Sequence, residues 1–116
     1  MRKSEYILSV RWWFYVTIAG WIITLPASAQ DAAVLLEQGR TQYEAQQYEE
    51  AEETLRALVK QESTSAPAYL WLGRVLDAQT RYKDAEKEIK KALKIDKTLT
   101  EGHIELAKHM IRQGDL

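Results

Sequence analysis

The stretch APAYLWLGRVLDAQTRYKDAEKEIKKALKID, residues 66–96, decides the fold of this chain. It contains two apolar stripes at helical spacing: Tyr69, Leu72, Gly73 and Leu76, then Ala85, Ile89, Ala92 and Leu93. Residues at i, i+3, i+4 and i+7 lie on one side of an α-helix. The polar residues 80–82 between the stripes are too few for anything but a tight reversal. The stretch therefore predicts two antiparallel helices, over residues 66–79 and 83–95.

The same pattern recurs 34 residues upstream. The matching pairs are Ala32 and Ala66, Gly39 and Gly73, Arg40 and Arg74, Tyr48 and Tyr82, Ala51 and Ala85, and Leu55 and Ile89. A fixed period of this length is typical of stacked helical hairpins. We expect one repeat over residues 32–65, a second over 66–99 and a half repeat over 100–116. The additional predicted helices cover residues 32–46, 49–61 and 100–113.

These residues follow the order and spacing of the tetratricopeptide repeat, and the chain resembles exported, bacterial-type members of that family. The resemblance implies an all-α fold, a short right-handed superhelix of αα-hairpins with about two and a half repeats and five helices. The residues expected to pack the repeats are Gly39, Tyr48, Ala51, Tyr69, Leu72, Gly73, Tyr82, Ala85, Ile89 and Ala92. Gly73 and Ala85 are expected where two helices approach closely, because larger side chains would separate them. Tyr82 is expected to cover that contact.

The resemblance also implies a concave groove lined by the first helix of each repeat. Its expected residues form an aliphatic row (Leu36, Leu70, Ile104), a cationic row (Arg40, Arg74, Lys108) and two nearby aromatics (Tyr43, Trp71). These rows suit a partner peptide with acidic and apolar side chains, because arginine grips carboxylates with a two-pronged fork. The alternative is that the cations are ordinary solvated positions and that Trp71 packs on the neighbouring repeat.

Some tetratricopeptide domains bind the carboxylate end of chaperone tails through Lys, Asn and Arg side chains. The matching positions here hold Leu36 with Arg40, Trp71 with Arg74, and Glu101 with Glu105. The asparagines are absent and the last pair has the wrong sign, so we do not expect that activity.

Residues 1–29 have the layout of a secretory signal peptide. Three basic residues lie in residues 1–11, and residues 12–25 form an uncharged apolar run. Pro26 and the small-x-small site of residues 27–29 follow. Such a run spans about 21 Å as a helix, less than the ~30 Å of a bilayer core. We expect cleavage after Ala29 and a periplasmic or extracellular domain over residues 30–116; the alternative is an uncleaved membrane anchor.

Charge is divided unequally along the expected domain. Residues 30–65 carry 3 basic and 8 acidic side chains, and residues 66–116 carry 10 and 8. Solvated helix faces explain this division, and head-to-tail self-association is the alternative. The last helix presents an apolar stripe, His103, Leu106, Ala107 and Met110, that a further helix would cover. Either the chain is a fragment, or Leu106 and Met110 form an interface with a partner or a second copy.

Catalysis finds no support in the sequence. The chain has no cysteine, no glycine-rich phosphate loop and no zinc helix signature. His103 and His109 are six positions apart on one helix and do not share a metal ion readily. The net charge of −1 gives no field that favours nucleic acid. We therefore expect no enzyme, cofactor or metal, and either a peptide-binding adaptor or a structural subunit of a cell-envelope complex.

Overall fold

The structure is a computed structural model that describes residues 27–114, with the side chains of residues 31–114. The predicted signal segment lies almost entirely outside the described residues. The described part contains five α-helices: α2 (Ala27–Glu44), α3 (Tyr48–Gln61), α4 (Ala66–Ala78), α5 (Tyr82–Ile95) and α6 (Thr100–Gln113). The all-α fold is confirmed, and α2 begins earlier than the predicted start at residue 32. None of these helices is long and apolar enough to cross a membrane.

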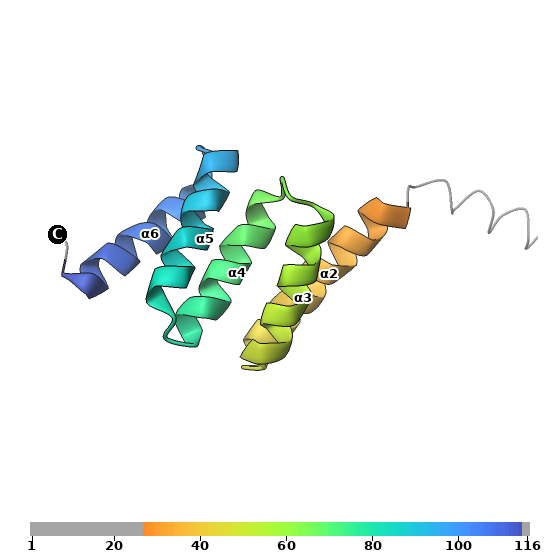
Figure 1. The fold of residues 1–116 in the computed structure, drawn as a ribbon, viewed down its shortest axis with the longest axis horizontal. Helices are drawn as coiled ribbons and strands as arrows, with labels where there is room; N and C mark the ends of the chain where they lie inside the picture. Colours follow the sequence, from red (N-terminus) through yellow and green to blue (C-terminus); the bar gives the residue numbers. More distant parts are fainter. Residues whose placement is uncertain (1–26, 115–116) are drawn as a thin grey trace, which may run out of the picture. The chain divides into compact units, whose positions relative to one another are not determined.

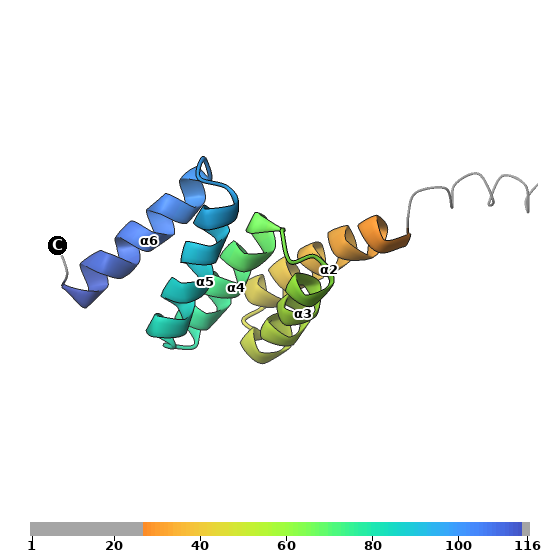
Figure 2. The same cartoon turned by 45° about the horizontal axis from the view of Figure 1, so that its top comes forward.

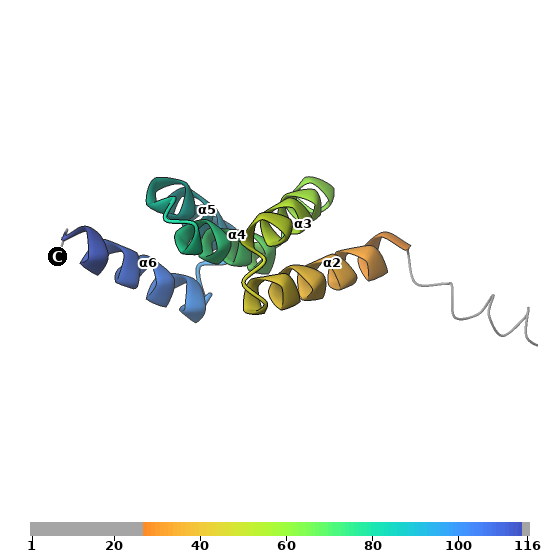
Figure 3. The same cartoon turned by 90° about the horizontal axis from the view of Figure 1, so that it is seen from below.

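From Ala32 onward the helices follow one another in a row from α2 to α6 (Figure 1). In the turned view the N-terminal part of α2 extends beyond α3 at this end of the row (Figure 2). Seen from below, α2, α4 and α6 lie along one side of the row and α3 and α5 along the other (Figure 3). The first helix of each repeat therefore faces one side of the molecule, and the second helix faces the other.

Two groups of buried apolar residues hold the row together. The larger group joins the first repeat to α4 and to the start of α5: Ala32, Ala51, Leu55, Leu58, Ala68, Leu72, Val75, Leu76 and Ala85. The smaller group joins α4 to α5: Leu70, Ile89 and Ala92. The apolar stripes predicted from helical spacing are therefore the stripes that become buried.

Gly73 lies at a close contact between α4 and α5. A Cβ atom at this position would lie 2.6 Å from the Ile89 Cγ1 atom and 3.3 Å from the Ala85 carbonyl oxygen. Gly39 has the same role in the first hairpin, with the Leu55 side chain at 2.7 Å. Gly102 on α6 also approaches a neighbour, Leu93, and this third close contact was not predicted.

The two hairpin turns have the same backbone conformation. Gln46 and Thr80, which occupy equivalent positions in successive repeats, have φ angles of 61° and 63°. In each turn the next amide donates to a carbonyl five positions back: Gln47 to Gln42 at 2.8 Å and Arg81 to Leu76 at 2.9 Å. A single left-handed residue with such a hydrogen bond is a common way to end a helix. The period in the sequence thus extends to the turns.

The structure places the ring of Tyr82 against α6, with its centroid 5.9 Å from that of His109. The Arg112 guanidinium lies over the same ring at 5.2 Å, and Tyr82 is 36% exposed. The reason is its place as the first residue of α5, on the side of that helix that receives α6.

Glu52 ties α3 to the turn between α4 and α5. Its carboxylate accepts from the Arg56 Nε at 2.8 Å, and both of its oxygens lie 3.0 Å from the Arg81 Nη1 atom. Partial burial acts to raise the pKa of Glu52, but the hydrogen bonds from Arg56 and Arg81 outweigh it, and the pKa lies below its ordinary value. A depressed carboxyl pKa stabilises the fold above the unfolded-state pKa of about 4.3, and this stability is lost as the pH falls below that value.

Glu52→Gln is therefore expected to lower the melting temperature at neutral pH and to make its decline between about pH 5 and pH 3 shallower than in the wild type. Thermal melts followed by circular dichroism over this pH range check the prediction. Glu53→Gln is the matched control, since the Glu53 side chain is exposed and pairs with no described residue. Equal pH profiles for Glu52→Gln and the wild type would contradict the assignment.

Candidate protein-interaction site

The eight predicted binding residues all belong to α2, α4 and α6, and the side of the molecule that these helices form is here called the first-helix face (Figure 3). At its centre lies the Trp71 cluster, which consists of Arg40 and Tyr43 from α2 and Trp71 and Arg74 from α4. The Arg74 Cζ atom lies 4.5 Å from the Trp71 ring centroid, and the Arg40 Cζ atom lies 5.3 Å from it. The Tyr43 ring meets Trp71 edge-on, at a centroid distance of 5.6 Å. A half-buried tryptophan between two guanidinium groups joins the two repeats.

Arg74 is already paired within the chain. Its Nε atom donates to Glu105 at 3.2 Å and its Nη2 atom donates to Glu101 at 3.2 Å. Only 18% of the Arg74 side chain is exposed. The Lys108 ammonium lies 3.6 Å from the same Glu105 carboxylate. Two of the three cations in the predicted row therefore face carboxylates of α6.

Arg40 has a different environment although it occupies the same repeat position. One repeat before Glu101 and Glu105 the chain has Pro67 and Trp71, so Arg40 meets an aromatic ring where Arg74 meets carboxylates. Its nearest acids belong to its own helix, with Glu37 at 3.4 Å and Glu44 at 4.0 Å. The Arg40 Nε atom is buried and has no hydrogen-bond partner among the described residues. Of the three cations in this row, Arg40 is the one with a buried nitrogen that has no hydrogen-bond partner among the described residues.

Tyr43 adds a neutral hydrogen-bonding group beside Arg40. Burial raises the pKa of its hydroxyl above the ordinary value, and the nearby Tyr48 raises it further. The hydroxyl thus keeps its proton at neutral pH and is available both to donate and to accept. The aromatic rings make the α2–α4 half of the first-helix face apolar, and its two polar groups are the Tyr43 hydroxyl and the Arg40 guanidinium.

The three residues of the predicted aliphatic row differ in their exposure. Leu36 is half-buried against the larger core group, and Ile104 is 49% exposed. Leu70 is only 2% exposed and packs against Ile89 and Ala92. Its prediction as a surface contact is corrected, because α4 is the central first helix and its apolar side is covered by α5.

The predicted interface on α6 is also corrected in part. Leu106 is half-buried and packs against the smaller core group. Met110 is 37% exposed, and the exposed apolar surface of α6 continues through Ile104 and Ile111. His109, which the sequence did not mark as a core residue, is 2% exposed and lies with its Nδ1 atom 3.6 Å from Asp77. Among residues 31–114 no group of His, Asp and Glu side chains is arranged to hold a metal ion.

The fold and the face together define a class of protein, the helical-hairpin solenoid, whose first helices present an interaction surface. The model of the tetratricopeptide repeat matches residues 36–99, more than half of the chain. The chain belongs to the tetratricopeptide repeat family. No curated protein matches it.

Several solved structures share the fold. MamA (residues 41 to the end) from Desulfovibrio magneticus RS-1 is 27% identical, with a TM-score of 0.58 over 80% of this chain and 49% of that chain. The Type III secretion translocator chaperone SycD of Yersinia enterocolitica is 21% identical, with a TM-score of 0.72 over 75% of this chain and 66% of that one. The first tetratricopeptide domain of Spaghetti (RPAP3), solved with an HSP90 peptide, is 18% identical, with a TM-score of 0.53 over 73% and 94%. The chain thus spans about half the length of MamA.

Proposed function

We propose that this chain is a non-enzymatic protein-interaction module that binds a segment of a partner protein across the first-helix face. One observation carries the proposal: the Arg40 guanidinium lies over Trp71, 43% of its side chain is exposed, and its acidic neighbours belong to its own helix. A carboxylate of the partner would pair with the exposed end of this guanidinium through a charge-assisted hydrogen bond. Action outside the cytoplasm is part of the proposal and is supported by the signal-like layout of residues 1–29.

The rest of the face limits the chemistry of the partner segment. Trp71, Tyr43 and Leu36 offer half-buried apolar surface next to Arg40. Aromatic and arginine side chains are frequent anchors of interfaces. A segment with one acidic side chain followed by apolar ones fits this half of the face. The family supports a protein partner: SycD is a translocator chaperone, and the repeats of Spaghetti bind the acidic peptide SRMEEVD.

Affinity capture tests the proposal. The tagged full chain is expressed in its native host, crosslinked, purified and analysed by mass spectrometry. We expect one or a few proteins that are recovered with the wild type and lost when Arg40 is replaced. Recovery of the same proteins with the wild type and the Arg40 variant would contradict binding at this face.

Glu101 and Glu105 compete with the carboxylate of the partner segment for Arg74. Replacing both with glutamine leaves Arg74 without its ion pairs and is expected to strengthen binding of an acidic partner segment, roughly threefold to tenfold. Isothermal titration of the captured segment into the wild type and into Glu101→Gln/Glu105→Gln measures the change. A weaker affinity for the variant would show that these carboxylates contact the partner themselves.

A second candidate is association through α6, with a partner or a second copy. The exposed apolar side chains of Ile104, Met110 and Ile111 favour it, since exposed apolar surface can mark an interaction site. Light scattering at micromolar concentration distinguishes it from a purely adaptor role: mass above that of the monomer, lost in Met110→Glu, supports association through this helix.

A further inference from the structure

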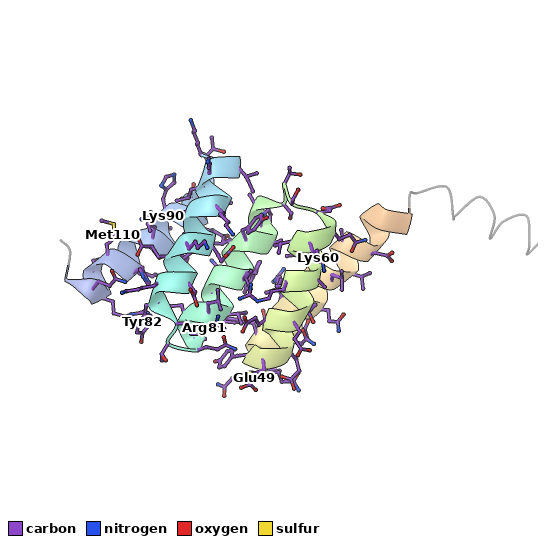
Figure 4. The ribbon with its side chains drawn as sticks, viewed as in Figure 1. Glu49, Lys60, Arg81, Tyr82, Lys90 and Met110 are labelled. Atoms are coloured by element: carbon purple, nitrogen blue, oxygen red, sulfur yellow. The ribbon has the colours of Figure 1, made fainter. Side chains whose placement is uncertain are left out.

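Five lysines lie on the side of α5 that faces away from the core, and together they form what we call the lysine ridge. Its members are Lys83, Lys87, Lys90, Lys91 and Lys94, all exposed. Spacings of three and four positions bring them to one side of the helix. With Glu86 they surround a shallow surface depression. Figure 4 shows Lys90 on the side of α5 turned to the viewer.

Acidic neighbours neutralise the ridge only in part. Lys90 pairs with Glu86, and the Lys91 Nζ atom lies 3.1 Å from Glu88. The other three lysines form no ion pair with residues 31–114: Lys83, Lys87 and Lys94. Like charges four positions apart destabilise a helix, and the ridge contains three such pairs: Lys83 with Lys87, Lys87 with Lys91, and Lys90 with Lys94. A bound polyanion would relieve this repulsion.

The packing of the repeat does not require lysine at these positions. At the equivalent positions of the first repeat, on α3, the chain has Glu49 where α5 has Lys83 and Glu53 where it has Lys87. Both helices bury the opposite side, and the same surface position accepts either sign of charge. Lys90 and Lys94 have basic equivalents on α3, Arg56 and Lys60, whereas the other three lysines do not, so the full ridge occurs only in the second repeat.

We propose that the lysine ridge binds the anionic headgroup surface of a lipid bilayer. Lysine rows on an exposed helix suit such a surface, because each ammonium is a point charge that needs no fixed geometry. The ridge contains no arginine and no aromatic side chain of the kind that grips phosphates and stacks on bases in nucleic-acid sites. The apolar residues 12–25 suit either a signal peptide or an anchor, and both bring the chain to a membrane.

The ridge and the first-helix face belong to opposite sides of the row, with α5 on one and α2, α4 and α6 on the other (Figure 3). Binding to a bilayer through α5 therefore leaves Arg40 and Trp71 accessible. The inference does not depend on what the first-helix face binds.

Vesicle co-sedimentation of the full chain tests the proposal. Vesicles of phosphatidylcholine and phosphatidylglycerol in equal amounts are compared with vesicles of phosphatidylcholine alone. We expect the anionic vesicles to bind the wild type more tightly, with an affinity that falls as salt is added. Lys87→Glu/Lys91→Glu is expected to lower that affinity at least about tenfold. The apolar residues 12–25 are present in both proteins, so the difference between them reports the ridge.

The matched control is Lys60→Glu/Lys108→Glu, which makes the same change in net charge on α3 and α6, and circular dichroism verifies that every variant is folded. An affinity retained by this control supports the proposal. An equal loss of affinity in the control would show that the effect depends on net charge alone, and it would overturn the proposal. So would unchanged binding of the ridge variant, or a short DNA duplex that binds the ridge more tightly than the vesicles do.

Discussion

Gly73→Leu is expected to unfold the repeat array. A side chain at this position enters the space held by Ile89 and meets the Ala85 backbone, and backbone cannot move aside as a flexible side chain does. Overpacking typically costs about 1–3 kcal/mol and occasionally more, and the backbone contact places Gly73→Leu at the upper end, a large part of the roughly 5–15 kcal/mol that typically stabilises a domain. The melting temperature should fall by more than about 10 °C, measured by circular dichroism.

Ala107→Leu is the matched control for Gly73→Leu. Ala107 lies one repeat after Gly73, at the same repeat position, but it is exposed on α6. We expect its replacement to change stability by less than about 0.5 kcal/mol. If Gly73→Leu melts at the same temperature as Ala107→Leu, then the close approach of α4 and α5 is not what holds the second repeat together.

Arg40→Glu is expected to give the largest loss of partner binding. The change removes the incompletely paired guanidinium and adds a third carboxylate beside Glu37 and Glu44, so that an acidic segment is repelled. Losing an anchor of this kind typically costs about 2 kcal/mol or more, roughly a 30-fold weaker affinity. Because 43% of the Arg40 side chain is exposed, we expect stability to change by less than about 1 kcal/mol. Titration calorimetry and thermal melts separate the two effects.

Lys60→Glu makes the same charge change on α3 and serves as the control for Arg40→Glu. Arg74→Glu is a less informative variant, because it would place three carboxylates together with Glu101 and Glu105. Its binding defect would be mixed with a loss of stability. Wild-type affinity in Arg40→Glu would remove Arg40 from the binding site.

The fold was predictable because each packing feature and each turn occurs again in the next repeat. The repeat interval places Gly39 and Gly73 at equivalent helix contacts and Gln46 and Thr80 at equivalent turns. Helix bounds follow from the apolar stripes to within a few positions. Such features depend on the spacing of residues along the chain, which can be read from the sequence.

The candidate site was less predictable because equivalent positions have different neighbours in the array. Leu36, Leu70 and Ile104 share one repeat position, yet one is half-buried, one is buried and one is exposed. Arg74 and the equivalent Arg40 both lie over Trp71, but Arg74 pairs with acids of α6 and Arg40 pairs with acids of its own helix. These contacts depend on the angle between successive first helices and on which helix is central, and neither can be inferred from spacing along the chain.

Site-specific photo-crosslinking tests the central claim most directly. A benzophenone amino acid is placed at position 44, beside Arg40 on α2, or at position 53, on the exposed side of α3, in the full chain within its native host. We expect a crosslinked partner protein at position 44 but not at position 53, and we expect this crosslink to be lost when Arg40→Glu is added. Adducts that form equally at position 53, or that persist at position 44 in the Arg40→Glu chain, would contradict binding at the first-helix face.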